Sequence, residues 1–146
     1  MNELTILCRL LLAAIFGGLI GLERELHGRA AGLRTHILVC IGSALLMLIS
    51  IELARQWQGS APDPARIAAQ VVTGIGFLGA GTIIRERAGI RGLTTAASIW
   101  TIAAVGLAIG MGFYFAALVT TAIALVALHF FSRLERRFSK RGDEGE

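Results

Sequence analysis

The chain has 146 residues, of which 55% are hydrophobic and only 16% are charged. Soluble domains carry about 25% charged residues, and the mean hydropathy here is +0.69, so the composition excludes an ordinary water-soluble domain and indicates a membrane protein. The 14 Lys and Arg residues outnumber the 10 Asp and Glu residues. Because the basic residues lie in short stretches between apolar runs, they indicate membrane topology and no nucleic-acid partner. The length predicts one compact unit.

Five apolar runs of 17 to 19 residues follow one another along the chain. At a rise of 1.5 Å per residue, such a run spans about 26–28 Å, close to the hydrocarbon thickness of a bilayer. The runs show no strand-like alternation, and backbone groups in lipid must be satisfied within the segment, so we expect helices. The sequence therefore predicts an all-α membrane protein, with a five-helix transmembrane domain over residues 1–131 and a charged cytoplasmic tail over residues 132–146. The predicted spans are residues 4–22, 36–54, 67–84, 93–109 and 113–131.

The distribution of basic residues predicts the orientation of these spans. Segments 23–35, 85–92 and 132–146 together carry eleven Lys and Arg residues, whereas the loops on the opposite side carry only Arg55 and Arg66. The positive-inside rule then places the N-terminus outside and the C-terminus in the cytoplasm.

Glycines recur at helical spacing within the apolar runs. Residues 74–79 match the GxGxxG pattern of dinucleotide-binding loops, but they lie inside an apolar run, and no acidic residue follows about 20 positions later. In a bilayer, small residues allow helices to approach closely, so the GxxxG spacings at 17–21 and 106–110 predict helix–helix contacts. The spacing leaves open whether these contacts lie within one chain or join two copies. The glycines of residues 76–81 predict that the third helix lies at the centre of the bundle.

Two ionisable residues, Arg9 and Glu52, lie within the apolar runs at similar predicted depth in the outer leaflet. An unpaired charge at mid-bilayer costs roughly 2.5–3.5 kcal/mol, and less near an interface. One hypothesis is therefore an intramembrane charged pair, or a small outer cavity that both residues line. The alternative is that each side chain extends separately to the headgroups.

Two polar stretches at the predicted inner ends of the spans are the most informative part of the sequence. Residues 21–25 (GLERE) precede residues 31–36 (AGLRTH), and residues 85–87 (RER) precede residues 91–95 (RGLTT). Both end in Gly-Leu-x-Thr at the start of a span. This pattern favours a paired inner vestibule built from two parallel helix–loop–helix halves, a plan known in transporters. The simpler interpretation is that the threonines cap or back-bond the helix starts.

No catalytic pattern accompanies these stretches, so we expect no enzymatic activity and no cofactor. The sequence has no GxSxG or HExxH motif, and His27, His36 and His129 are dispersed, so spacing alone assembles no metal-ligand cluster. Magnesium prefers carboxylate and water oxygens, and Glu52 is the one carboxylate within the predicted spans, so magnesium binding stays open. A polar path would need hydroxyl groups, which more often bond backbone carbonyls of their own helix. The candidates are Thr73, Thr82, Thr94, Thr95, Ser98 and Thr101.

The two polar stretches, together with GIGFLGAG at 74–81 and GLTTAASIW at 92–100, resemble the MgtC/SapB family of bacterial membrane proteins over about residues 11–117. The resemblance implies a multi-pass protein of the bacterial inner membrane, associated with growth at low magnesium. The shorter, SapB-like branch is the nearer match, because founding members carry a C-terminal soluble domain that is not seen here. The resemblance carries a functional motif onto Glu23, Arg24, Glu25, Gly32, Leu33, Arg34, Thr35, Gly76, Gly79, Gly81, Gly92, Leu93, Thr94, Thr95 and Trp100.

The resulting functional hypothesis is a regulatory or accessory membrane protein linked to magnesium homeostasis. It would act through intramembrane helix contacts with another membrane protein or with itself, as a homo-oligomer, and the 23–35 loop would be the cytoplasmic contact or sensing surface. The alternative hypothesis is a small oligomeric magnesium channel or transporter, with a path lined by Thr and Ser and guarded by Glu23, Glu25 or Glu52.

Overall fold

The computed structural model describes residues 1–56, 63–87 and 89–142, with side chains up to Phe130 in the last helix. Within these residues it contains five helices, which confirms the helical class, and one short antiparallel β-hairpin that the sequence did not predict. The elements are α1 (Glu3–Leu26), α2 (Leu33–Gln56), α3 (Ala65–Ala80), β1 (Ile84–Glu86), β2 (Gly89–Arg91), α4 (Leu93–Met111) and α5 (Tyr114–Gly142).

Each helix overlaps one of the predicted spans, but the helices differ in length. Three of those in the described residues, α1, α2 and α4, are long and apolar enough to cross a membrane. The apolar helix α3 and the apolar part of α5, Tyr114–Phe130, are shorter. The third run was predicted to continue to Ile84, but α3 ends at Ala80. The hydroxyl of Thr82 donates a hydrogen bond to the carbonyl of Gly79 at 2.8 Å, and the chain then turns into β1.

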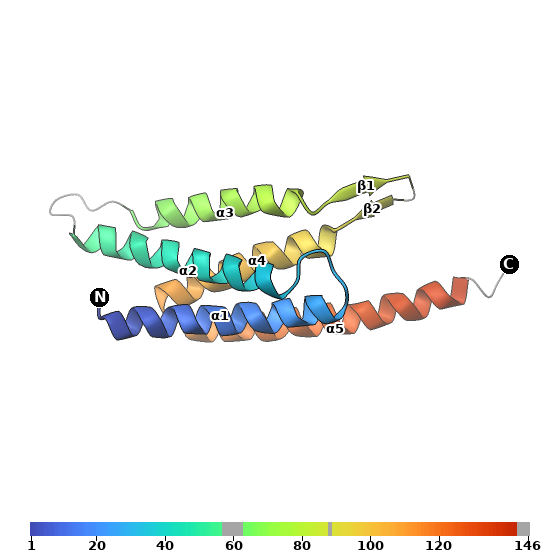
Figure 1. Ribbon diagram of the computed structural model, residues 1–146, viewed down its shortest axis with the longest axis horizontal. Helices are drawn as coiled ribbons and strands as arrows, with labels where there is room; N and C mark the ends of the chain where they lie inside the picture. The colour runs from blue at the N-terminus through green and yellow to red at the C-terminus, as the bar shows by residue number, and fades with distance from the viewer. Residues whose placement is uncertain (57–62, 88, 143–146) are drawn as a thin grey trace.

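The helices lie side by side along one long axis, and α4 occupies the centre of the bundle (Figure 1). Helix α4 contacts all four other helices, whereas α3 lies at one edge and packs against α2 and α4. The prediction that the third helix is central is therefore wrong. The reason is visible at its glycines: a Cβ atom at Gly74 or Gly76 would meet nothing within 4 Å.

The two GxxxG pairs form close helix contacts inside the bundle. A Cβ atom at Gly17 would lie 2.7 Å from the carbonyl oxygen of His36, so α1 presses directly against the backbone of α2. Further along α2, a Cβ at Gly110 would lie 2.6 Å from the carbonyl oxygen of Ala44, and one at Gly106 would collide with the carbonyl oxygen of Cys40. The helix contacts that the spacing predicted are thus confirmed, and they lie within one chain.

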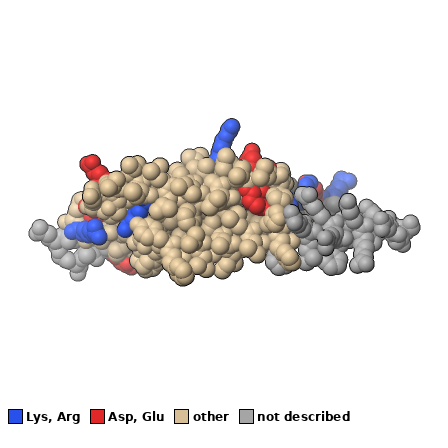
Figure 2. Space-filling model, turned by 90° about the horizontal axis from the view of Figure 1, so that it is seen from below, with Lys and Arg blue, Asp and Glu red and all other residues tan. Residues whose placement is uncertain are grey.

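The packed interior contains small and β-branched residues, and many of the largest apolar side chains point outward. Ile20, Ile102 and Ile109 are at most 1% exposed, whereas Phe77 is 83% and Phe115 is 80% exposed. The face in Figure 2 has a broad uncharged stretch between two groups of charged side chains. A surface of this kind suits lipid and would be poorly soluble in water. Both the surface and the long apolar helices therefore support a membrane protein.

The three segments that carry most of the basic residues lie at the same end of the bundle. The α1–α2 connection, the β-hairpin and the C-terminal half of α5 are all at the right of Figure 1, opposite the N-terminus. Both polar stretches of the sequence are therefore gathered at one end, which we call the motif end.

Candidate functional site

The turn between α1 and α2 at the motif end is held by Glu25. Its carboxylate oxygen Oε2 accepts a hydrogen bond from the backbone N–H of Leu33 at 2.9 Å, at the start of α2. An anionic acceptor stabilises a helix start because the first backbone N–H groups have no partner within the helix. The same carboxylate occupies the space that a Cβ atom at Gly32 would need. Glu25 and Gly32 therefore form one structural unit.

This unit predicts a non-additive pair of substitutions. In the wild-type background Gly32→Ala should lower stability, because the new methyl group overlaps the Glu25 carboxylate. Glu25→Ala alone should cost about 0.5–2 kcal/mol, as for the loss of other helix N-caps. In the Glu25→Ala background, Gly32→Ala should add little, since the nearest remaining atom, Glu25 Cβ, lies 3.5 Å away. Thermal unfolding of all four proteins in detergent measures the coupling, and purely additive shifts would contradict the assignment.

The last turn of α1 carries a buried guanidinium group, that of Arg24. Arg24 is 1% exposed, and its Nη1 lies 3.5 Å from Oε2 of Glu23. The Arg24 atoms Nε and Nη2 have no hydrogen-bond partner, and neither carboxylate oxygen of Glu23 has one. The pair is therefore held mainly by charge and is only partly satisfied by hydrogen bonds.

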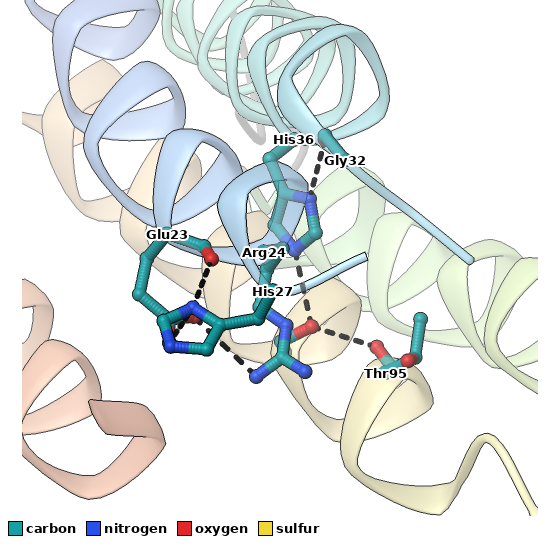
Figure 3. A network of polar contacts seen from close by, with 7 residues as sticks. Glu23, Arg24, His27, Gly32, His36 and Thr95 are labelled. Carbon is teal, nitrogen blue, oxygen red and sulfur yellow. Dashed lines mark hydrogen bonds and ion pairs between the residues drawn. The ribbon is translucent and has the colours of Figure 1, made fainter. Parts of the chain in front are cut away.

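His36 and Ser98 continue the polar cluster from α2 into α4 (Figure 3). His36 is fully buried, and its Nδ1 lies 2.9 Å from the Gly32 carbonyl oxygen, which only accepts, so Nδ1 carries a proton. Its Nε2 lies 3.1 Å from the Ser98 hydroxyl, and this hydroxyl lies 2.8 Å from the carbonyl oxygen of Thr95. The Ser98 hydroxyl has one hydrogen, so it donates either to the Thr95 carbonyl or to Nε2 of His36. In the second case Nε2 must accept the hydrogen bond, which requires His36 to be neutral. The protonation state of His36 is thus coupled to the Ser98 hydroxyl.

The second predicted stretch is shaped by Gly92. This residue precedes α4 with φ +92°, in the left-handed region, and a Cβ atom there would collide with the carbonyl oxygen of Thr82. Its counterpart, Gly32, is needed for a different reason, the Glu25 carboxylate. The two predicted halves therefore share a helix–connector–helix plan, but a turn joins α1 to α2 and a β-hairpin joins α3 to α4.

The remaining motif residues divide between the interior and the surface. Thr95 is buried beside Ser98, Gly79 packs against Ala96 of α4, and Leu33 is half-buried at the start of α2. The exposed motif residues are Arg34, Thr35, Gly76, Gly81, Leu93, Thr94 and Trp100. The structure thus brings the first stretch and Thr95 together and leaves the others apart.

Arg9 and Glu52 have separate partners at the opposite end of the bundle. Arg9 donates hydrogen bonds to the Gly110 carbonyl at 2.7 Å and to the Tyr114 hydroxyl at 3.0 Å. Glu52 lies 3.3 Å from the amino group of Met1 and accepts a hydrogen bond from Gln56 at 3.2 Å. No ion pair joins Arg9 and Glu52, although the structure describes both. The direct pair predicted from their depth does not form, because carbonyl and hydroxyl acceptors on α4 and α5 satisfy Arg9 instead.

The histidines take a larger part in the structure than the sequence predicts. His36 is an essential part of the polar cluster, and one signal was available, a polar residue at the start of an apolar run directly after Gly-Leu-Arg-Thr. His27 and His129, which are 102 positions apart, lie in contact with ring centroids 6.0 Å apart. With Glu23 they form a group of three metal-ligating side chains. Spacing alone could not predict this group, because α5 brings His129 to the end of α1 only in the folded chain.

The chain is similar to known bacterial proteins. YhiD of Escherichia coli (strain K12), named as a candidate magnesium transporter, is 47% identical over 138 residues, which cover 91% of this chain and 63% of YhiD. Protein MgtC of Salmonella typhimurium (strain LT2) is 49% identical over 119 residues, which cover 81% of this chain and 48% of MgtC. The chain thus spans less than two thirds of these relatives. No solved structure matches it. The MgtC family model matches residues 10–137, and the chain, a bundle of apolar helices, therefore belongs to the MgtC family.

Proposed function

We propose that the protein is a regulatory or accessory membrane protein linked to magnesium homeostasis, and that it acts through intramembrane contacts with a second copy of itself or another membrane protein. The link to magnesium is supported by relatives such as YhiD and MgtC, which are named for magnesium transport or are members of the same family. The mode of action is supported by the packing of the glycines.

The observation that carries this proposal is an open glycine groove between α2 and α3. The glycine pairs of α1 and α4 are fully occupied by contacts with α2, whereas Gly42 of α2 and Gly74 of α3 have no atoms near their Cβ positions. Both glycines line an apolar groove of about 480 Å³, together with side chains such as Leu38 and Leu78. Small residues along a groove allow another helix to approach closely in a bilayer, where packing drives association.

Filling this groove should prevent self-association without unfolding the chain. Gly74→Leu places a side chain into the groove, where the structure leaves room for it. We expect dimers or larger oligomers of the wild-type protein in lipid vesicles, measured by resonance energy transfer between labelled copies, and at least a tenfold weaker association for Gly74→Leu. The melting temperature should stay within about 2 °C of wild type, since no packed atom is displaced.

Gly76→Leu is the matched control for this experiment. Gly76 lies on the same helix, also has no atoms near its Cβ position and does not line the groove. It should associate like wild type. Loss of association in Gly76→Leu but not in Gly74→Leu would move the contact to another face of α3, and monomers in all three proteins would leave another membrane protein as the partner.

The alternative, an oligomeric magnesium channel or transporter, finds less support in the described hydroxyl groups. Thr73, Thr82 and Thr101 each donate a hydrogen bond to a carbonyl of their own helix or its end. They are therefore used in local bonds, as the simpler interpretation predicts. Magnesium flux into proteoliposomes decides between the two functions, with Arg34→Ala as the control. Saturable flux that this variant lacks would favour transport, whereas sealed vesicles would favour regulation.

For the topology we propose five spans in the bacterial inner membrane, with the motif end in the cytoplasm and the N-terminus outside. The excess of basic residues in the three segments at the motif end supports this orientation. The charge-assisted turn and the β-hairpin would then face the cytoplasm, where soluble factors have access to them.

A further inference from the structure

The end of α1 and the middle of α5 meet in a cluster of three side chains. Glu23 lies on the last turns of α1, His27 directly follows that helix, and His129 comes from α5. One nitrogen of each imidazole and one carboxylate oxygen of Glu23 all lie within 4.8 Å of one another. This is the group of metal-ligating side chains that stands out among the described residues.

The two carboxylate oxygens of Glu23 have different neighbours. Its oxygen Oε2 faces the Arg24 guanidinium, and its oxygen Oε1 lies 3.1 Å from Nδ1 of His27. The side chain is only 10% exposed, and neither oxygen has a hydrogen-bond partner. A buried carboxylate that lacks hydrogen bonds is costly unless a cation compensates it. Oε1, on the side of His27, can therefore ligate a metal ion while Oε2 keeps its contact with Arg24.

His27 is oriented by its own helix. Its Nδ1 lies 2.7 Å from the backbone carbonyl oxygen of Glu23, to which it donates a hydrogen bond, so Nε2 keeps its lone pair (Figure 3). A hydrogen bond from one ring nitrogen to a backbone carbonyl is the usual way in which proteins hold a metal-binding imidazole. His129 is exposed and completes the cluster from the opposite helix, which leaves a route for an ion from outside.

The donor set identifies the class of ion. Two imidazole nitrogens and one carboxylate oxygen suit Zn²⁺ and similar divalent transition metals, which bind such sets with a fourth position open to water. Magnesium prefers six oxygen ligands and fits this set poorly. Ligands about 2.0–2.2 Å from one ion lie at most about 4.4 Å apart, and the three ligand atoms here lie within 4.8 Å of one another.

We propose that Glu23, His27 and His129 form a binding site for a divalent transition-metal ion of the zinc class. The bound ion joins the end of α1 to α5 at the motif end, and it binds the Glu23 oxygen that does not face Arg24. This site is separate from the groove between α2 and α3, so it stands whether or not the chain self-associates.

The test uses the full chain in detergent, purified with a tag that contains no histidine and treated with a chelator. A Cys8→Ser background removes the exposed thiol, which would otherwise bind zinc. Zn²⁺ is titrated in competition with a coloured chelator, and Co²⁺ reports the geometry through its visible absorption. We expect one Zn²⁺ per chain, a Co²⁺ spectrum typical of four-coordinate nitrogen and oxygen ligands, and no displacement of Zn²⁺ by excess Mg²⁺.

The variants are chosen so that a loss of Zn²⁺ binding cannot be attributed to unfolding. His129→Gln changes an exposed residue and should weaken Zn²⁺ binding at least tenfold, as should His27→Gln. Glu3→Gln, which alters a carboxylate at the far end of the same helix, should bind like the parent. Zn²⁺ should also raise the melting temperature of the parent and not that of His129→Gln. Equal affinity of His129→Gln and the parent, no saturable binding by folded protein, or displacement by Mg²⁺ would each overturn the proposal.

Discussion

Replacing Glu23 with Gln is expected to destabilise the protein by about 3–5 kcal/mol, the usual cost of removing one partner from a buried ion pair. The substitution leaves the Arg24 guanidinium 1% exposed, with no opposite charge beside it. Two of its nitrogen atoms already lack hydrogen bonds, so no other group in the described structure takes over. Thermal or denaturant unfolding in detergent, with a chelator present throughout, measures the loss.

The double variant Glu23→Gln, Arg24→Met tests whether the ion pair stabilises the protein or only offsets the cost of burying its two charges. Apolar replacement of a whole buried pair is often neutral or stabilising, because the desolvation cost disappears with the charges. We therefore expect the double variant to be more stable than Glu23→Gln alone. Glu86→Gln is the surface control: its partner Arg91 lies 3.7 Å away and 78% exposed, so the loss should stay below about 1 kcal/mol. A Glu23→Gln protein as stable as this control would contradict the buried-pair assignment.

The second large effect is expected at Gly106, where even one methyl group should force two helices apart. In Gly106→Ala, the new Cβ would collide with the carbonyl oxygen of Cys40 and lie 2.8 Å from Cβ of Ser43. Overpacking a well-packed core costs typically 1–3 kcal/mol and occasionally more, and backbone atoms of a helix yield less than a side chain. We expect a loss of about 3 kcal/mol or more, which corresponds to a fall in melting temperature of roughly 10 °C.

Gly42→Ala is the control for this contact between α2 and α4. Gly42 lies on α2, two residues beyond Cys40, and its Cβ position is open. Because alanine is also the better helix former, this variant should melt at the wild-type temperature or slightly above it. A small, equal effect of the two substitutions would show that α2 and α4 do not meet at Gly106.

The class and helical content of this protein follow from its sequence because both depend on local properties. The length and composition of each apolar run determine whether a helix is stable in a bilayer, and all five predicted runs overlap helices in the structure. The polar stretches that resemble the MgtC family also have local causes, since Glu25 and Gly32 meet across one short turn. The hairpin was missed because its strands, with three residues each, are too short to show alternation.

What only the tertiary structure decided is which helix faces meet. Spacing identified the glycine pairs, but it did not show that α2 receives both of them, nor that α3 lies at the edge with its glycines open. The partners of the charged residues were also decided by the tertiary structure. Their similar depth in the membrane suggested that Arg9 pairs with Glu52, but the rotation of α4 and α5 brings Gly110 and Tyr114 to Arg9 instead. His27 and His129 meet for the same reason. Such contacts depend on the rotation and crossing of packed helices, and these are set by the whole interior rather than by any one segment.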